Sequence, residues 1–341
     1  MPTALNDLLK ATSRSFYLTL RVLPARVRPQ IGLAYLLART TDTIADTEIL
    51  PVAQRFEALQ KLRERILGQN SAPLNFGELA EKQNLSAEKM LLENVEDSLS
   101  ALQNFPVADQ KLIRDVLTTI TSGQELDLKR FENSSAGKII TLQTEAELDD
   151  YTYRVAGCVG GFWTKICRAH LFPNAKIDDT QFIADGIRFG KGLQLVNILR
   201  DLPKDLRNGR CYLPKEKLVE AGLSPEDLLL PANEARFRPL YNSYLDLAES
   251  HLAAGWNYTN TIPFSQFRVR LACAWPILIG MKTIEKLRTA NVMELQQRVK
   301  VMRGEVHVIL LRSVASYPFP RAWRNLFVAA GKAVASGENL A

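Results

Sequence analysis

Two short stretches of the 341-residue chain place paired acidic residues on otherwise apolar segments. In "RTTDTIADT" the aspartates are Asp42 and Asp46, and in "NILRDLPKD" they are Asp201 and Asp205. Two carboxylates this close on a buried surface repel each other, and they shift towards protonation unless a cation lies between them. If the two stretches face each other across a cavity, they supply four carboxylates. Such an oxygen-rich set suits Mg²⁺, or Mn²⁺ in its place, holding a substrate phosphate.

Helical geometry groups each aspartate pair with further polar residues. At about 100° per residue, each polar set falls on one narrow stripe of its helix, and most neighbouring residues are apolar. A solvent-facing edge is the usual interpretation of a single DxxxD pattern. A helix that is apolar nearly all round is buried instead, so its polar residues need partners. The stripes are Tyr35, Arg39, Asp42 and Asp46 in the first stretch, and Gln194, Asn197, Asp201 and Asp205 in the second.

The chemistry that needs both a cation site and an apolar pocket is the ionisation of an allylic diphosphate. Mg²⁺ neutralises the diphosphate as its C–O bond breaks, and Arg39 and Arg200 match the geometry of phosphate. The carbocation left behind needs a dry pocket with few nucleophiles. A helical bundle lined with Leu, Ile and Phe provides one.

Composition and charge narrow the class of protein. The chain is 46% hydrophobic and 23% charged, with a net charge of +6, which suits an anionic small molecule or an acidic membrane surface. Nucleic acid is disfavoured because no basic run is interleaved with aromatic residues.

We find no signal segment and no uncharged run of the roughly 18 residues that a membrane span needs. Scattered cysteines without CxxC indicate reduced thiols and a cytoplasmic protein: Cys158, Cys167, Cys211 and Cys273.

Helical periodicity dominates the chain, and no alternating strand pattern is convincing. Because repeats and low-complexity linkers are absent, we predict one all-α domain over residues 1–341. We interpret "SSAGK" as a turn, since it lacks the spacing of a phosphate-binding loop. The predicted helices cover about 28–47, 51–68, 108–128, 180–202, 238–260 and 267–290, with connections at 69–76, 132–140, 171–179, 206–213 and 220–234.

Four motifs follow one another along the chain: "YxxxRxxDxxxD" from Tyr35, "YTYRVAGCVGGF" from Tyr151, "QxxNxxRDxxxD" from Gln194 and "GRCYLP" from Gly209. Each alone is weak, but in this order and at these intervals they resemble the squalene and phytoene synthases, the head-to-head prenyl transferases. The resemblance covers nearly the whole chain, from "SRSFYLTLRVLP" to "VKVMRGEV". It implies an α-helical isoprenoid-synthase bundle around a central active-site cavity.

The resemblance also implies roles for individual residues. Asp42, Asp46, Asp201 and Asp205 would bind the Mg²⁺ ions that bridge the diphosphates, and Arg39, Asp42 and Asp201 would act in catalysis. Tyr151 matches a tyrosine implicated in proton transfer or cation handling. The substrate, farnesyl diphosphate, would contact Ser13, Arg14, Phe16, Tyr35, Arg39, Gln194, Asn197, Arg200, Arg210 and Tyr212.

Within the family, "SRSF", "TDTIAD" and the C-terminal "CAWPILIGMKTIEKL" favour a squalene synthase. Such an enzyme joins two farnesyl diphosphates through presqualene diphosphate and then reduces the product with NADPH, which Asn197, Lys300 and Arg303 would bind. In the other direction, Met302 stands where an arginine is usual, and "NILRD" and "GRCYLP" look more like phytoene synthases. The alternatives are a non-reducing dehydrosqualene or phytoene synthase, or a presqualene diphosphate synthase.

The end of the chain, "YPFPRAWRNLFVAAGKAV" (317–334), sets Trp323 and Phe327 among basic residues. We expect an interfacial helix, within a peripheral helix or tail at 317–341, that delivers an insoluble product to the inner face of the membrane. Packing of this helix on the bundle is the alternative. No stable protein partner is implied.

Two other classes of protein compete with this interpretation. Chain-elongating prenyl transferases and terpene cyclases also use aspartate-rich helices with Mg²⁺, but they lack the QxxNxxRDxxxD pattern. A non-catalytic helical scaffold would leave both stripes solvated and replaceable.

Overall fold

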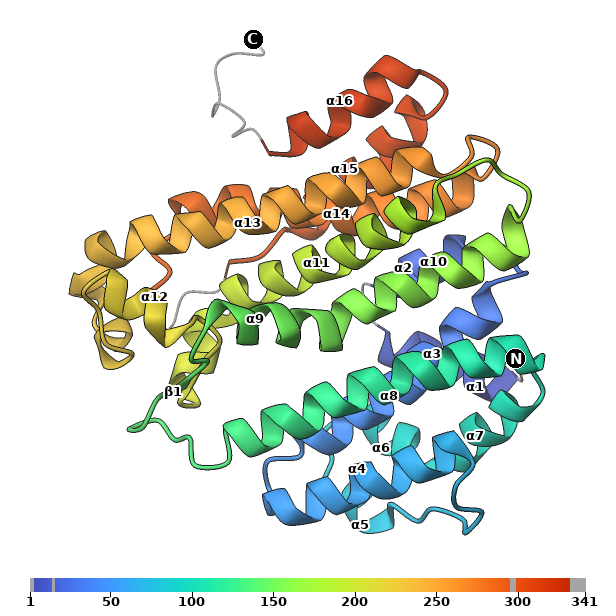
Figure 1. Ribbon diagram of the computed structural model, residues 1–341, viewed down its shortest axis with the longest axis horizontal. Coiled ribbons are helices and arrows are strands. Elements are labelled where there is room, and N and C mark those ends of the chain that lie inside the picture. The colour runs from blue at the N-terminus through green and yellow to red at the C-terminus, as the bar shows by residue number, and fades with distance from the viewer. Residues whose placement is uncertain (1–2, 14–15, 295–298, 332–341) are drawn as a thin grey trace. The chain divides into compact units, whose positions relative to one another are not determined.

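The protein is mainly α-helical over the residues that the computed structural model describes, which are 3–13, 16–294 and 299–331 (Figure 1). The all-α class is therefore confirmed, and every predicted helix is present with ends shifted by a few residues. In the described part of the chain, no helix combines the length and apolar character that a membrane crossing needs. Contacts divide the chain into two compact units, which comprise 1–133 with 153–187 (unit 1) and 134–152 with 188–341 (unit 2).

Unit 1 is built around the long helices α3 and α8. Helix α3 contacts α4, α7 and α8, and α8 also contacts α4 and α10. Leu33, Leu36 and Leu37 of α3 are fully buried, as the apolar pattern of this helix predicts. The helices are α1 (Thr3–Thr12), α2 (Phe16–Val22), α3 (Arg28–Asp46), α4 (Val52–Leu67), α5 (Gly77–Glu81), α6 (Ser86–Glu93), α7 (Val95–Gln103), α8 (Val107–Arg130), a π-helical turn (Tyr153–Gly157), α10 (Cys158–Leu171) and the start of α11 (Asp179–Arg207).

A buried polar link fixes three of these helices. The carboxylate of Asp109 on α8 accepts a hydrogen bond from Gln30 Nε2 on α3 at 3.0 Å, and its other oxygen lies 2.8 Å from Nε2 of His170 on α10. Asp109 is only 2% exposed, so loss of either partner would leave a buried acceptor incompletely paired. This link holds the N-terminal half of α3, and the first aspartate motif lies on its C-terminal half.

Unit 2 combines a helical pair, α13 with α14, and a short parallel ladder (Figure 1). Helix α14 also contacts α15 and α16. The hydroxyl of Tyr241 on α13 donates to the backbone oxygen of Leu199 at 3.0 Å and so ties α11 to α13. The elements are β1 (Ile140–Thr141), α9 (Glu145–Thr152), the rest of α11, β2 (Arg210–Cys211), α12 (Lys215–Glu220), two 3₁₀ turns (Glu226–Leu229 and Pro231–Asn233), α13 (Glu234–Thr261), α14 (Phe267–Thr289), α15 (Arg303–Ser316) and α16 (Pro320–Ala330).

The ladder departs from the purely helical prediction. Strands β1 and β2 pair in parallel over two residues each, a length that shows no alternation in the sequence. Ser135 and Lys138 exchange backbone hydrogen bonds, so the predicted turn at "SSAGK" is present. Gly209 has φ +73°, and a Cβ there would lie 2.1 Å from the backbone oxygen of Ser135. Glycine is therefore required immediately before Arg210.

Gly160 on α10 meets α11 at backbone distance. A Cβ at this position would lie 1.8 Å from the carbonyl oxygen of Gly186, a distance that no side-chain rotation relieves. Gly160 therefore allows the close approach of the two helices.

We predict that Gly160→Ala lowers the free energy of unfolding by about 1–3 kcal/mol, because the added methyl group must push α10 and α11 apart. Gly161→Ala is the matched control on the same helix, since its Cβ would meet only the Ile187 side chain at 3.6 Å. That variant should be neutral, or more stable by about 0.5–1 kcal/mol through lower chain entropy. Urea denaturation of both variants measures the difference, and equal midpoints would contradict the close approach.

Candidate active site

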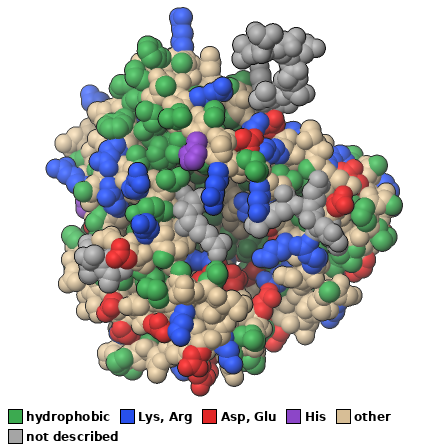
Figure 2. All heavy atoms as spheres, turned by 180° about the vertical axis from the view of Figure 1, so that it is seen from behind, with side chains coloured by type: hydrophobic (Ala, Val, Ile, Leu, Met, Phe, Trp, Pro, Cys, Tyr) green, Lys and Arg blue, Asp and Glu red, His purple; other side chains and the backbone are tan. Residues whose placement is uncertain are grey.

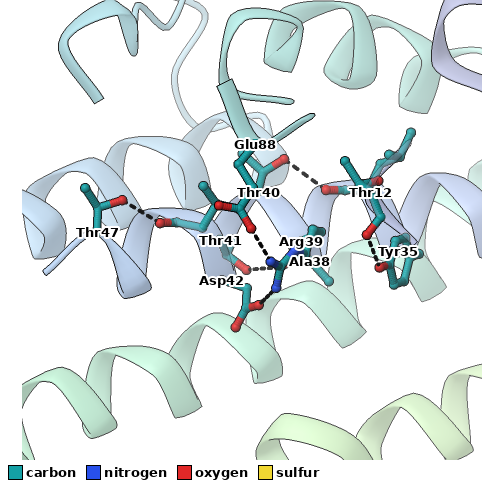
Figure 3. Close-up of polar contacts among 11 residues, drawn as sticks. Thr12, Tyr35, Ala38, Arg39, Thr40, Thr41, Asp42, Thr47 and Glu88 are labelled. Carbon is teal, nitrogen blue, oxygen red and sulfur yellow. Dashed lines mark hydrogen bonds and ion pairs between the residues drawn. The ribbon is translucent and has the colours of Figure 1, made fainter. Parts of the chain in front are cut away.

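The first cluster of functional residues lies on α3 and α6 in unit 1. We call Tyr35, Arg39, Asp42, Asp46 and Glu88 the N-terminal cluster. Arg39 donates from Nη1 to Asp42 Oδ2, and its Nη2 lies 2.5 Å from Glu88 Oε1 (Figure 3). The guanidinium thus lies between a carboxylate of its own helix and one from α6. Asp46 is the last residue of α3 and is exposed.

The charges in the N-terminal cluster support one another. Burial disfavours the charged form of Arg39, but Asp42 and Glu88 outweigh it and raise the pKa of the guanidinium. Desolvation raises the pKa of the Asp42 carboxyl, Arg39 opposes this rise, and the Glu88 charge adds to it. Because the Asp42 side chain is still 41% exposed, water screens part of this effect. Arg39 is the cation that the two-carboxylate stripe requires.

Helices α1 and α2 bring further predicted residues to α3. The Tyr35 hydroxyl donates to the backbone oxygen of Thr12 at 3.2 Å, and its ring stacks on Phe16 with centroids 5.0 Å apart. Ser13 is buried, and its hydroxyl donates to the backbone oxygen of Leu9. Arg14, also predicted to bind substrate, lies outside the described residues.

The second cluster lies on α11 in unit 2. We call Gln194, Asn197, Arg200, Asp201 and Asp205 the C-terminal cluster. Arg200 binds Asp201 with both ends of its guanidinium, Nε to Oδ1 at 2.9 Å and Nη2 to Oδ2 at 2.6 Å. The hydrogen bond that Arg200 donates to Asp201 raises the pKa of the guanidinium, burial opposes this rise, and the charges of Asp201 and Asp205 add to it.

The amide residues of the C-terminal cluster, Asn197 and Gln194, lie about one and two turns before the arginine. Asn197 is exposed, and its Nδ2 lies 3.5 Å from Gln194 Oε1. Both amides therefore keep donor and acceptor capacity for a ligand.

Two further predicted residues meet in unit 2. The rings of Tyr151 on α9 and Tyr212 after β2 stack with centroids 4.7 Å apart, and both residues are 8% exposed. Arg210 occupies β2 and is half-buried. Cys211, between Arg210 and Tyr212 in the sequence, is fully buried, and burial raises the pKa of its thiol to about 12. The thiol is therefore inert, and all four cysteines are free, as predicted.

Lys300 and Arg303, predicted to bind NADPH, lie at the start of α15. Both are exposed, as is Met302 between them, at 65%. Lys286 Nζ bonds the backbone oxygen of Lys300 at 3.2 Å and the carboxylate of Glu305 at 2.6 Å. The start of α15 is therefore tied to α14 while the cationic side chains remain accessible.

The aromatic residues near the C-terminus differ from their expected placement. Trp323 is 3% exposed, stacks on Trp256 at 5.2 Å, and donates from Nε1 to Asn260 Oδ1 at 2.8 Å. Phe327 lies against the same ring at 6.0 Å. An interfacial placement of Trp323 is therefore wrong, and the alternative, packing on the bundle, holds for both rings. The part of the expected helix from residue 332 lies outside the described residues.

The two clusters have the same arrangement of charged side chains. In each, two carboxylates lie one helical turn apart, and an arginine neutralises one of them. Oxygen-only donors of this kind fit a hard cation such as Mg²⁺. Over the described ranges, no three Asp, Glu, His or Cys side chains converge as a ligand set. The donor chemistry therefore fits the predicted metal.

Glu88 is the functional candidate that the sequence did not indicate. It is 49 residues from Arg39, and no motif or periodicity connects the two. Only the packing of α6 on α3 brings its carboxylate to the arginine.

Two arginine–aspartate clusters on the helices of a mainly α-helical chain give donor groups suited to a cation and a phosphate. A family model described as squalene/phytoene synthase matches residues 9–305, and the chain belongs to that family of prenyltransferase-type enzymes. A bifunctional lycopene cyclase/phytoene synthase of Phaeosphaeria nodorum is 30% identical over 257 residues, which are 75% of this chain and 41% of that protein. Squalene synthase ERG9 of Saccharomyces cerevisiae is 26% identical over 313 residues, 90% of this chain and 66% of that protein.

The fold agrees with this family. The structure of TcSQS in complex with the ligand E5700 matches with a TM-score of 0.77 at 21% identity, covering 98% of this chain and 94% of that chain. The chain spans less than two thirds of the length of either sequence relative named above. Since relatives of both the squalene and the phytoene kind are found, membership of the family covers both reactions.

Proposed function

We propose that the protein is a squalene synthase. It joins two farnesyl diphosphates head to head to presqualene diphosphate, releasing one diphosphate and one proton, and then reduces this intermediate to squalene. The observation that carries the proposal is the pair of arginine–aspartate clusters in a member of this family. The match to squalene synthase ERG9 over 90% of the chain supports the choice within the family.

The aspartates of the two clusters are proposed to hold Mg²⁺, and Mn²⁺ can replace it. When bound, this ion would neutralise the charge of the departing diphosphate. Arg39 and Arg200 present planar N–H donors that match phosphate oxygens. Each arginine neutralises an aspartate when no ligand is bound and can turn to the diphosphate once a cation takes its place. Tyr35 adds a neutral polar group to the N-terminal cluster, and Gln194 and Asn197 add such groups to the C-terminal cluster.

Tyr151 is proposed to accept and pass on the proton lost in the first condensation, at its hydroxyl oxygen. Its ring is buried against Tyr212, so the hydroxyl has one defined direction. A phenol is also a weak nucleophile, which suits a site that must not trap a carbocation.

Lys300 and Arg303 are proposed to hold the phosphates of NADPH. Their exposed cationic side chains suit phosphate recognition. When bound, NADPH would supply the hydride that replaces the second diphosphate. Asn197 is proposed to contact the same cofactor.

A non-reducing dehydrosqualene or phytoene synthase is the second candidate. It would end the reaction by loss of a proton in place of hydride addition. The 30% identity to a bifunctional lycopene cyclase/phytoene synthase favours it, as does the neutral, 65% exposed Met302 within the basic stretch.

Product analysis distinguishes the two candidates. Purified full-length protein is incubated with farnesyl diphosphate and Mg²⁺, with and without NADPH, and the extracts are analysed by gas chromatography and mass spectrometry. We expect squalene only in the tube with NADPH. Dehydrosqualene in both tubes would support the second candidate, and the absence of any C30 product would contradict both a squalene synthase and a dehydrosqualene synthase.

We also predict that Glu88→Gln weakens metal binding. Without the Glu88 charge, Arg39 pairs with Asp42 alone. It then competes more strongly with the metal ion for the Asp42 carboxylate. A part-buried ion pair contributes about 1 kcal/mol, so its loss should raise the dissociation constant for the metal about fivefold. Calorimetric titration with Mn²⁺ in the presence of inorganic diphosphate measures this constant directly.

Glu93→Gln is the matched control for this variant. Glu93 lies on the same helix, is exposed, and faces Lys89 at 3.9 Å. Its Mn²⁺ affinity should equal that of the unmodified protein. Equal affinities for the Glu88 and Glu93 variants would show that Glu88 does not act on the metal site.

A further inference from the structure

Helix α15 exposes apolar side chains on its outer side. Leu311 is 70% exposed, Val314 53% and Val308 47%, whereas the polar Ser313 is fully buried. The Ser313 hydroxyl accepts a hydrogen bond from Nε1 of Trp275 at 2.9 Å, which identifies the inner side of the helix. A surface helix normally has the opposite polarity, with its apolar residues inside and its polar residues outside.

The three exposed residues form one continuous stripe. At about 100° per residue, Val308, Leu311 and Val314 lie within roughly 120° of one another. We call these three residues the α15 face. Exposed apolar residues also precede and follow the helix, namely Met302 at 65% and Phe319 at 63%. Grouped apolar side chains of this kind mark an interaction site more often than single ones do.

The surroundings of the α15 face are strongly basic. The described segment 299–331 contains five Lys or Arg residues and a single acidic residue, Glu305, which is paired with Lys286. The five basic residues, all exposed, are Lys300, Arg303, Arg312, Arg321 and Arg324. Figure 2 shows hydrophobic side chains gathered with Lys and Arg beside them in the upper part of the view, and α15 and α16 lie in the upper part of Figure 1.

The inner sides of these helices are firmly attached, so the α15 face cannot turn inward. Arg270 donates from Nη2 to Asn260 Oδ1 at 2.7 Å, and the same oxygen accepts from Trp323 Nε1. The Arg270 guanidinium lies 5.5 Å from the ring of Tyr317 and 5.4 Å from that of Trp323. This cluster holds the turn between α15 and α16 and the start of α16 against α13 and α14.

We propose that the α15 face binds the surface of an anionic lipid bilayer. The apolar stripe would enter the headgroup region, and the surrounding arginines would contact acidic headgroups. A second copy of the chain is a poorer occupant, because it would bring two basic segments together. The binding itself does not depend on the proposed function. If that function is correct, the bilayer also receives a hydrocarbon product that water does not dissolve.

Vesicle flotation with the full-length protein tests this surface. We expect it to float with vesicles of phosphatidylcholine and phosphatidylglycerol, and much less with phosphatidylcholine alone. The variant V308S/L311S/V314S should bind the mixed vesicles about tenfold or more weakly, because three side chains lose their apolar contact. I49S/V107S/V219S is the matched control, since those residues are 71%, 82% and 63% exposed on other parts of the chain. It should bind as the unmodified protein does.

A second variant tests the charges separately. R321Q/R324Q should weaken binding to the mixed vesicles by about fivefold for each arginine, and should leave the weak binding to phosphatidylcholine unchanged. Loss of salt dependence should accompany it.

Three outcomes would overturn the proposal. They are failure of the unmodified protein to float, equal flotation of the α15-face variant, and a dimer in light scattering that the same variant converts to monomer. The last would identify the face as an interface between copies. Product formation from detergent-dispersed farnesyl diphosphate is measured in parallel. Flotation without any product would leave this surface intact and refute only the proposed function.

Discussion

The candidate site depends on the need of a half-buried aspartate for a positive charge beside it. On α3 this charge is Arg39 beside Asp42, and on α11 it is Arg200 beside Asp201. Without Arg39, desolvation and the Glu88 charge would raise the pKa of the Asp42 carboxyl further and favour its neutral form. With the arginines in place, both helices carry acidic groups that stay available to a stronger cation. A charge balance that a ligand can rearrange is the physical basis of the proposed Mg²⁺–diphosphate site.

Each arginine–aspartate pair is positioned by contacts elsewhere on its helix. The N-terminal half of α3 is fixed by the buried Gln30–Asp109–His170 link, and Tyr35 connects the middle of α3 to α1. The hydrogen bond from Tyr241 holds α11 at Leu199, the residue next to Arg200. These contacts fix the backbone while leaving the charged ends of the side chains free to exchange partners. Precise helix placement is therefore the contribution of the fold to the site.

Much of the fold and part of the site could be predicted from the sequence. The apolar periodicity predicts the long helices, and helical spacing places Arg39 beside Asp42, because both follow from geometry within one element. Glu88 could not be predicted, since its approach to Arg39 depends on the packing of two helices. The two-residue strands β1 and β2 carry no periodic signal. Trp323 was misplaced because an amphipathic aromatic suits a membrane interface and a helix contact equally well, and only the partners Trp256 and Asn260 decide between them.

The most direct measurement is a calorimetric titration of the full-length protein with farnesyl S-thiolodiphosphate, an analogue that does not ionise readily. It is carried out with Mg²⁺ and again with EDTA, on the unmodified protein and on Asp42→Asn and Asp201→Asn. If the aspartates of each cluster are needed to hold the metal–diphosphate ligand, binding requires Mg²⁺ and is lost in each variant, while the circular dichroism spectrum stays helical. Binding that persists in EDTA, or in either folded variant, would contradict the proposed role of that variant's arginine–aspartate pair.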